Sequence, residues 1–359
     1  MTDPEGYAVY EGPAAGNTIE IEGIQPWSHA APVLYHAVLT LRDADGVLQE
    51  VVPYDIGFRR FEMINGVMCL NGERVVFNGV NRHEWNADRG RAIGADDMHA
   101  AMAVFKKNNI NAVRTCHYPD QSLWYDLCDR NGIYMIDETN LESHGSWQKL
   151  GAVEPSWNVP GSLPEWKDCV VDRARSMFER DKNHAAVLIW SCGNESYAGE
   201  DILAMSQFFH DHDPGRLVHY EGVFHCRAFD AISDMESRMY AKPWEIREYL
   251  ESHPKKPFIL CEYMHDMGNS LGGMESYVRL ADEFDQYQAA SSGTIWTRRS
   301  GTPTRLAAAC WATAATLRTA TPITTSAATA LSTPTVPRNP PCRTCATGTT
   351  PRRRAAHDA

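Results

Sequence analysis

The feature that most constrains this fold is a repeating pattern that begins near residue 60. Short apolar runs that end in polar residues alternate with segments of helical character, and the runs are RVVFNGVNRH, NAVRTCHY, IYMIDETN, AVLIWSCGNES, LVHYEG, AISDMESRMY and PFILCEY. This alternation is typical of strand–helix units that build a parallel sheet. Seven such strands in one series predict an α/β fold, a (β/α)8 TIM barrel over residues 60–288. An open doubly wound sheet is the alternative, disfavoured because no glycine-rich phosphate loop follows the first strand.

The residues after Gln288 belong to a different sequence regime. From 289 to 359 nine Arg stand against one Asp, with no Lys or Glu, a formal charge of +8 in a chain whose total is −12. The segment is mostly Ala, Thr, Pro and Arg without a period, which predicts a disordered tail over 289–359. A base lost just after Gln288 would explain the change, because a back-translation of QAASSGTIWTRRSG reads QGGFIWDNLDQALW in the neighbouring frame. We therefore expect a disrupted eighth strand and exposed strand edges.

Residues 1–59 have the alternation of short β-strands, in NTIEIEGIQ and YHAVLTLRDADGVLQEVVPYDIGFR. Asp45-Gly46 lies between two alternating runs and predicts a hairpin turn. The segment is interpreted as part of an immunoglobulin-like β-sandwich. It is shorter than the roughly 100 residues of a complete sandwich, so it is either truncated or pairs with something outside this chain.

Charge and composition narrow the function classes. The net charge of −12 argues against a nucleic-acid partner. No apolar run approaches the roughly 20 residues that span a bilayer, and the first residues, MTDPEGYAVYEGP, lack the basic and apolar regions of a secretory signal. These features predict a cytoplasmic globular protein with no membrane partner. Scattered cysteines in apolar contexts, including Cys116, Cys192 and Cys261, predict reduced thiols rather than disulfides.

Polar residues at strand ends are the candidates for chemistry, because the carboxyl ends of barrel strands converge on one face. They are Asn81, Arg82, His83, Glu84, Arg114, His117, Asp137, Glu138, Asn140, Asn194, Glu195, Tyr240, Glu262 and His265. Glu195 and Glu262 stand out because each ends a strongly apolar run. Two carboxyl groups on one rim suit glycoside hydrolysis, one as proton donor and one as nucleophile. A strand-end cap or an ion pair is the alternative for either residue alone, whereas the surrounding His, Asn, Arg and Trp favour the hydrolase.

Four segments carry a resemblance to a known family. FNGVNRHEWNADRGRA, AVRTCHYPDQSLWYDLCDRNGIYMIDETNLESHG, WSCGNES and ILCEYMHDMGNSLGG closely resemble the bacterial β-galactosidases of glycoside hydrolase family 2, of the large-subunit type. The segments fall in the family's order and approximate spacing, over about residues 20–288. The β-glucuronidases of the same family resemble this chain in fold, but GVNRHE and CEYMHDMGNS resemble the galactosidase branch.

The resemblance implies a retaining mechanism in which Glu195 is the general acid/base and Glu262 the nucleophile, with their carboxyls about 5 to 5.5 Å apart. Further roles are implied for the surrounding residues. Asn194 would bind the sugar 2-hydroxyl, Tyr240 would orient the nucleophile, Arg114 would keep it ionised, and His83, His117 and His265 would line the galactose site. Glu142 and His144 of NLESHG would bind Mg²⁺ together with Glu195.

This chain also differs from the family that it resembles. The family has an N-terminal jelly-roll domain and a first part of the sandwich that contribute to the sodium site and the oligomer, so we expect an incomplete Na⁺ site and leave the oligomeric state open. The family's tryptophan platform for galactose would fall at Gly293, and Trp296 is not its equivalent. Three interpretations stay open. The chain is an active β-galactosidase for lactose and related β-galactosides, an inactive truncated fragment of one, or a β-glucuronidase-like hydrolase.

Overall fold

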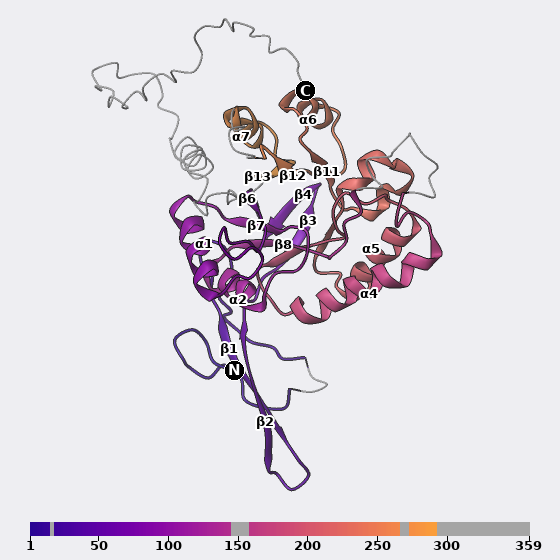
Figure 1. Cartoon of the computed structure of the whole chain (residues 1–359). Helices are drawn as coiled ribbons and strands as arrows, with labels where there is room; N and C mark the ends of the chain where they lie inside the picture. The colour runs from indigo at the N-terminus through magenta and orange to yellow at the C-terminus, as the bar shows by residue number, and fades with distance from the viewer. Residues whose placement is uncertain (15–17, 145–157, 266–272, 293–359) are drawn as a thin grey trace, which may run out of the picture. The chain divides into compact units, whose positions relative to one another are not determined.

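Eight parallel strands form the central sheet of this chain, which a computed structural model describes over residues 1–14, 18–144, 158–265 and 273–292. The chain divides into two compact units, 1–319 and 320–359, and every described residue lies in the first. The strands follow the order β10-β9-β8-β7-β6-β13-β12-β11, and Figure 1 labels β6, β7, β8, β11, β12 and β13 of this sheet. Their bounds are β6 Phe77–Arg82, β7 Ala112–Thr115, β8 Tyr134–Glu138, β9 Val187–Ser191, β10 Leu217–His219, β11 Glu236–Met239, β12 Phe258–Tyr263 and β13 Tyr287–Ser292. The α-helices are α1 Ala95–Lys107, α2 Ser122–Asn131, α4 Pro164–Asp181, α5 Glu200–His212, α6 Pro243–Glu251 and α7 Met274–Glu283, and two 3-10 helices are η2 Glu221–His225 and η3 Arg227–Ile232.

Hydrogen bonds join the two end strands of this sheet, so that it closes into a barrel. Asp234, just before β11, donates its N–H to the carbonyl of Val218 in β10 at 2.9 Å, and its carboxylate accepts the Val218 N–H at 2.7 Å. Further along, His219 Nε2 lies 2.8 Å from Ser237 Oγ. The predicted α/β barrel is confirmed.

The strand β13 occupies the eighth position, where we expected a disrupted strand. It pairs in parallel with β12 on one side and with β6 on the other. The buried Gln288 side chain anchors it, since Oε1 accepts the Met68 N–H at 2.7 Å and Nε2 donates to the carbonyls of Met68 and Val75, both at 2.8 Å. The prediction of a disrupted eighth strand is therefore wrong for Tyr287–Ser292. A strand pairs through backbone groups that almost any sequence supplies. Residues 293–359, including Gly293 and Trp296, lie outside the described residues.

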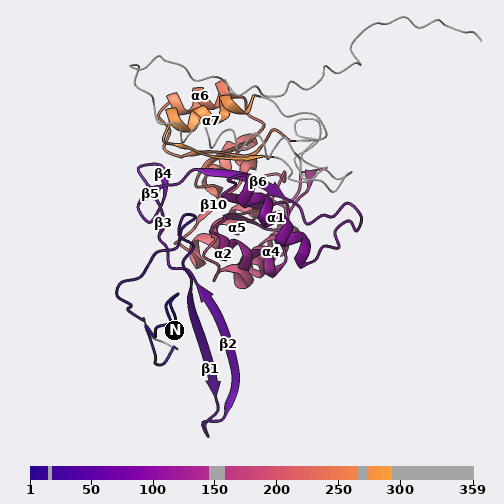
Figure 2. The ribbon, with the colours of Figure 1, turned by 90° about the vertical axis from the view of Figure 1, so that its left-hand side faces the viewer.

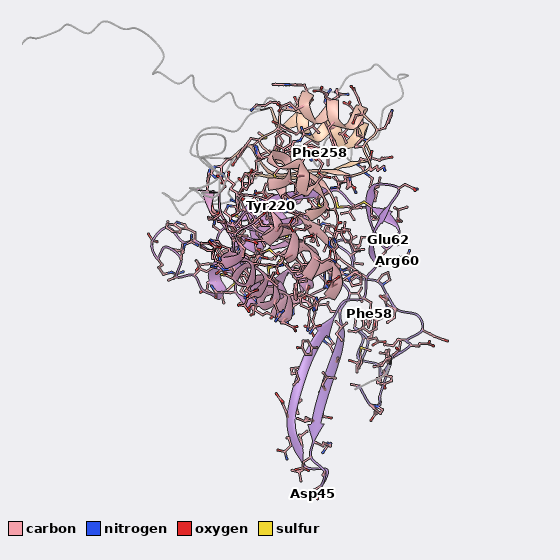
Figure 3. All side chains as sticks on the ribbon, turned by 90° about the vertical axis from the view of Figure 1, so that its right-hand side faces the viewer. Asp45, Phe58, Arg60, Glu62, Tyr220 and Phe258 are labelled. Atoms are coloured by element: carbon pink, nitrogen blue, oxygen red, sulfur yellow. The ribbon has the colours of Figure 1, made fainter. Side chains whose placement is uncertain are left out.

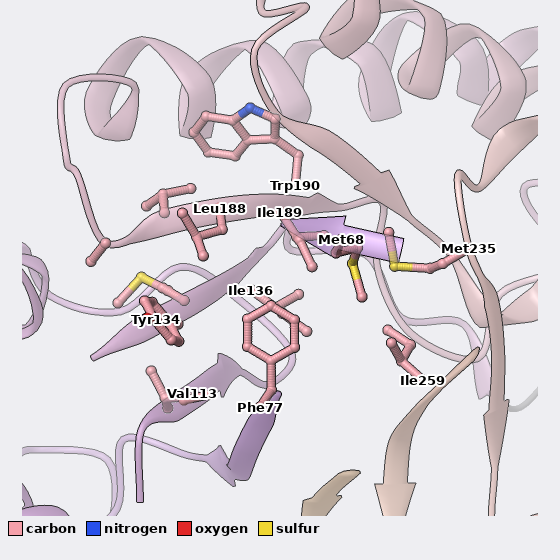
Figure 4. Packing of buried hydrophobic residues seen from close by; sticks show 14 of the residues in the cluster. Met68, Phe77, Val113, Tyr134, Ile136, Leu188, Ile189, Trp190, Met235 and Ile259 are labelled. Carbon is pink, nitrogen blue, oxygen red and sulfur yellow. The ribbon is translucent and has the colours of Figure 1, made fainter. Parts of the chain in front are cut away.

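Apolar side chains fill the barrel interior and the layer between the sheet and the helices (Figure 4). Phe77 meets Tyr134 edge-on across the barrel, with ring centroids 5.8 Å apart. Outside the sheet, Trp190 of β9 stacks on Phe209 of α5 at 5.4 Å. Helix α4 begins with Pro164 in its first turn and buries Val170, Ala174, Met177 and Phe178, a spacing that places them on one face. Helices α6 and α7 lie side by side over the β11–β13 side of the barrel (Figure 2).

An antiparallel meander precedes the barrel, formed by β3 (Phe61–Ile64), β4 (Val67–Leu70) and β5 (Glu73–Arg74). Met68 of β4 is fully buried and points among the barrel side chains (Figure 4). The meander therefore contributes to the barrel core as well as binding Gln288.

Residues before the meander form one hairpin, β1 (Tyr35–Arg42) with β2 (Leu48–Ile56), whose tip is marked by Asp45 in Figure 3. The hairpin predicted around Asp45-Gly46 is confirmed. Residues 18–25 form no strand, so the strand expected at NTIEIEGIQ is wrong there. Val38, Leu41 and Val47 are 57–59% exposed, because no second sheet covers this hairpin among the described residues.

Neither a disulfide nor a helix suited to a membrane occurs in the described ranges. The cysteines there are free, and Cys116, Cys192 and Cys261 are buried thiols, as predicted. None of the helices in these ranges has the length and apolar character needed to cross a bilayer.

Candidate active site

The parallel strands bring most of the predicted site residues to the carboxyl edge of the barrel. Because every strand of the sheet runs in the same direction, residues at the strand ends meet at that edge. The residues there are Arg114 in β7, Glu138 at the end of β8, Asn194 and Glu195 after β9, Tyr240 after β11 and Glu262 in β12.

Glu262 is a buried carboxylate held by three side chains. Arg114 Nη1 donates to its Oε1 at 2.9 Å, Tyr240 Oη donates to its Oε2 at 2.6 Å, and His117 Nε2 lies 3.7 Å from Oε1. Burial favours the neutral carboxyl, but Arg114, His117 and the hydrogen bond from Tyr240 outweigh it and lower the pKa of Glu262. Burial and the charge of Glu262 raise the pKa of Tyr240, so its hydroxyl remains a donor. Glu262 is therefore ionised at neutral pH, as a nucleophile must be.

Arg114 is fully buried and bonds to several side chains at the base of the site. Its guanidinium forms a forked pair with Glu138, from Nε to Oε2 at 2.6 Å and from Nη2 to Oε1 at 3.0 Å, and Nη2 also donates to Asn194 Oδ1 at 2.8 Å. Glu138 further accepts the Ser191 hydroxyl at 2.7 Å and lies 2.8 Å from His117 Nδ1. Burial opposes the charge of Arg114, yet its carboxylate neighbours, Glu138 above all, raise its pKa well above the usual value. A buried charge with this many partners is held in a single orientation.

Glu195 lies in the turn after β9 with backbone φ of 38°, in the left-handed region. His144 Nδ1 lies 2.7 Å from its Oε2. Burial raises the pKa of Glu195, His144 opposes that rise, and the charges of Glu262 and Glu142 add to it. A carboxyl with a raised pKa suits a proton donor. The separation of about 5 to 5.5 Å between the two carboxyls stays a prediction.

Three side chains at this turn could share a divalent cation. One ligand atom from each of Glu142, His144 and Glu195 lies within 4.8 Å of the others. Two carboxylates and one imidazole form a donor set that Mg²⁺ can accept, with water completing its coordination. Glu142 is exposed and the other two are half-buried, so solvent can supply that water. The residues therefore fit the ion that the resemblance implied.

His83 and His265 lie at the same edge, whereas two other candidates face helix α2: Asp137 accepts the Tyr125 hydroxyl at 2.7 Å, and the Arg82 guanidinium lies over the Trp124 ring at 4.0 Å. His83 follows β6, and its ring meets the His117 ring edge-on with centroids 5.4 Å apart. His265 follows β12 by two residues and is half-buried. The structure thus places Arg114, His117 and Tyr240 around the nucleophile candidate. The segment 266–272 that follows His265 lies outside the described residues.

Two residues at the site, Ser191 and Glu221, were not predicted to belong to it. Glu138 was among the predicted candidates, because it ends a buried apolar strand just as Glu262 does, but no role was assigned to it. Ser191 had no local signal, since its role depends on contacts between strands, whereas Glu221 follows the short apolar run in LVHYEG. Glu221 Oε1 accepts the backbone N–H of Glu195 at 2.7 Å, and burial raises the pKa of Glu221 to about 8.

A (β/α)8 barrel whose carboxyl edge holds two carboxyl groups with opposite pKa shifts defines a glycoside hydrolase type of site. The model of the family "Glycosyl hydrolases family 2, TIM barrel domain" matches residues 61–299, and that of "Glycosyl hydrolases family 2" matches residues 4–59. The chain belongs to glycosyl hydrolase family 2.

Curated relatives and solved structures extend this similarity. A β-galactosidase of Halalkalibacterium halodurans is 63% identical over 270 residues, which cover 75% of this chain and 26% of the relative. A β-galactosidase large subunit of Lactobacillus acidophilus is 57% identical over 278 residues, covering 77% and 44%. A β-glucuronidase from Ruminococcus gnavus in complex with uronic isofagomine shares the fold, with a TM-score of 0.74 over 88% of this chain and 63% of that one, at 18% identity. The chain thus spans less than half the length of these two curated relatives.

Proposed function

We propose that this chain carries the catalytic domain of a retaining β-galactosidase, which hydrolyses terminal non-reducing β-D-galactose residues such as that of lactose. The observation that carries the proposal is the placement of two carboxyl groups at one barrel edge, with Glu262 buried and held by Arg114 and Tyr240 and with Glu195 half-buried in the turn after β9. This placement leaves one carboxyl to give a proton and the other to attack. Relatives named β-galactosidase, at 63% and 60% identity, support galactose as the sugar.

The reaction proceeds in two displacements. Glu262 attacks the anomeric carbon while Glu195 protonates the departing oxygen, which leaves with the electron pair of the broken C–O bond and forms an alcohol. The product on the protein is a galactosyl ester of Glu262. Glu195, now a carboxylate, then takes a proton from a water molecule, whose oxygen attacks the anomeric carbon and frees Glu262. Two inversions give net retention.

Neighbouring residues bind and orient the reacting groups in this proposal. Arg114 and Tyr240 hold one oxygen each of Glu262, so that its lone pair faces the sugar. Asn194, fixed by its bond from Arg114, binds the sugar 2-hydroxyl. His83, His117 and His265 bind other galactose hydroxyls.

A bound Mg²⁺ would be held by Glu142, His144 and Glu195, and it would supply positive charge beside the acid/base. The contact of His144 with Glu195 Oε2 already orients this carboxyl. The proposal includes a subunit partner, because relatives such as that of Leuconostoc lactis are named as a large subunit. Sedimentation of the purified chain tests whether that partner is a second copy of this chain, and a purely monomeric chain would leave only a different subunit.

Hydrolysis of 4-nitrophenyl β-D-galactoside by the full chain tests the proposal. Glu262→Gln should abolish the activity. Glu236→Gln is the matched control, because Glu236 is also a buried carboxylate but pairs with Arg227 and Arg238 at the start of β11. EDTA should lower the rate, and Mg²⁺ should restore it less well in Glu142→Gln. A folded chain without hydrolysis would overturn the proposal for this chain, and a preference for the β-glucuronide would reassign the substrate.

A further inference from the structure

Two residues that follow β10 hold the backbone of the turn that carries the acid/base. Glu221 Oε1 accepts the N–H of Glu195 at 2.7 Å, and Tyr220 Oη lies 3.0 Å from the N–H of Ser196. The Tyr220 hydroxyl also donates to the Ser196 carbonyl. Two successive N–H groups of the turn therefore donate to two successive side chains just after β10.

This turn needs outside support because its backbone is strained. Glu195 adopts φ of 38°, a conformation disfavoured for residues with a Cβ, and Gly193, two residues earlier, has φ of 134°. A Cβ built on Gly193 would lie 2.6 Å from the Leu141 carbonyl oxygen, so the turn is also tightly packed against its neighbour. Strained turns persist where surrounding contacts hold them, and the Glu221 contact reaches the strained residue itself.

The position of Glu221 fits a supporting role better than contact with substrate. Its side chain is only 3% exposed, and it is bonded to the backbone of Glu195 rather than to the carboxyl of that residue. Its Oε2 has no hydrogen-bond partner within the described residues. Any displacement of the Glu195 N–H would change where the carboxyl of that residue points.

We propose that Glu221 is a positioning residue for the acid/base Glu195, because its Oε1 fixes the left-handed turn that aims the Glu195 carboxyl at the departing oxygen. The inference rests on the proposed function, since it assigns Glu221 to the proton-donating half of that reaction. It goes beyond that function by naming a residue that acts without touching the substrate. Glu221→Gln keeps an acceptor oxygen. Glu221→Met keeps most of the side-chain volume but has no acceptor oxygen.

Backbone hydrogen exchange of the full chain tests the geometric half of the proposal. In Glu221→Met, amides of peptides covering 193–197 should exchange about tenfold faster, the effect of losing one buried hydrogen bond, while Glu221→Gln stays within about threefold of wild type. Glu236→Gln is the control, and it should leave these peptides unchanged. Unchanged exchange in Glu221→Met would overturn the proposal. Glu221→Ala replaces Glu221→Met if the latter does not fold.

Leaving-group dependence tests the chemical half. A dinitrophenolate departs without protonation, whereas a phenolate requires an acid. In Glu221→Met, kcat/KM should fall about 100-fold for phenyl β-galactoside and less than about threefold for the dinitrophenyl compound, because only proton donation is misaligned. An equal fall for both substrates would overturn the positioning role. Wild-type chain that hydrolyses neither would overturn the proposed function, and the exchange result would still decide whether Glu221 holds the turn.

Discussion

Replacement of His219 by glutamine should make the protein more resistant to acid. His219 is fully buried in the barrel, with Nδ1 3.0 Å from Ser191 Oγ and Nε2 2.8 Å from Ser237 Oγ. Burial, aided by the charge of Arg114, lowers its pKa from 6.5 to about 3. A glutamine amide has about the reach of Nε2, so it can bond to Ser237, but it cannot take up a proton.

The expected magnitude follows from proton linkage. Below pH 6.5 His219 is protonated in the unfolded chain, whereas in the folded chain it stays neutral until the pH approaches 3. The stability contributed by neutral His219 is therefore fully present above pH 6.5 and is lost as the pH falls. Each pH unit in this window costs about 1.4 kcal/mol, so acidification from pH 6.5 to 4.5 should cost on the order of 3 kcal/mol through this one residue.

Urea unfolding followed by circular dichroism between pH 7.5 and 4.5 measures this loss. The free energy of unfolding of the wild type should fall by about 3 kcal/mol more than that of His219→Gln over this range. His99→Gln provides a matched control, because His99 is exposed on α1. Parallel acid losses in wild type and His219→Gln would refute the reasoning.

Three further substitutions test other parts of the structure. Arg114→Met leaves Glu138 buried without its forked partner, so urea unfolding should show a loss of about 3–5 kcal/mol, and a loss below about 1 kcal/mol would contradict this. Tyr240→Phe removes a hydrogen bond that lowers the pKa of Glu262, so the acid limb of the kcat/KM profile should move to higher pH, and an unmoved limb would argue against that bond. Gln288→Ala removes a partner from the Met68 N–H and from the carbonyls of Met68 and Val75, of which the Met68 carbonyl still accepts the Val75 N–H, so it should lower the unfolding free energy by roughly 2 kcal/mol, whereas the exposed Gln49→Ala should not.

The barrel could be predicted because its strands are local apolar runs whose order along the chain limits the topology. The strand β9, which precedes Glu195, and the strand β12, which contains Glu262, are fully buried and lie where their apolar runs predicted. The eighth strand was harder to foresee. Its anchor is the bond from Gln288 to Met68, 220 residues away in the chain, and no local pattern encodes such a contact. The strand expected in NTIEIEGIQ failed because alternation alone cannot supply a partner strand.

Part of the site could be predicted because charged residues that end buried strands are rare enough to be conspicuous. Glu195, Glu262 and their neighbours were found in this way and through the family resemblance. The role of Glu138 was missed because it acts through Arg114, and that geometry emerges only when β7 and β8 pair. Glu221 was missed because its partner is a backbone N–H, which is the same for every residue type.

Trapping the proposed intermediate tests the central claim most directly. A 2-deoxy-2-fluoro-β-galactosyl fluoride forms the ester readily and loses it slowly, because fluorine destabilises the positive charge that develops in both steps. After incubation with the full chain and proteolysis, mass spectrometry should find one fluorogalactosyl group on the peptide that contains Glu262, and none in Glu262→Gln. A label on Glu195 or another residue, or no label on folded protein, would contradict the assignment of Glu262 as the nucleophile.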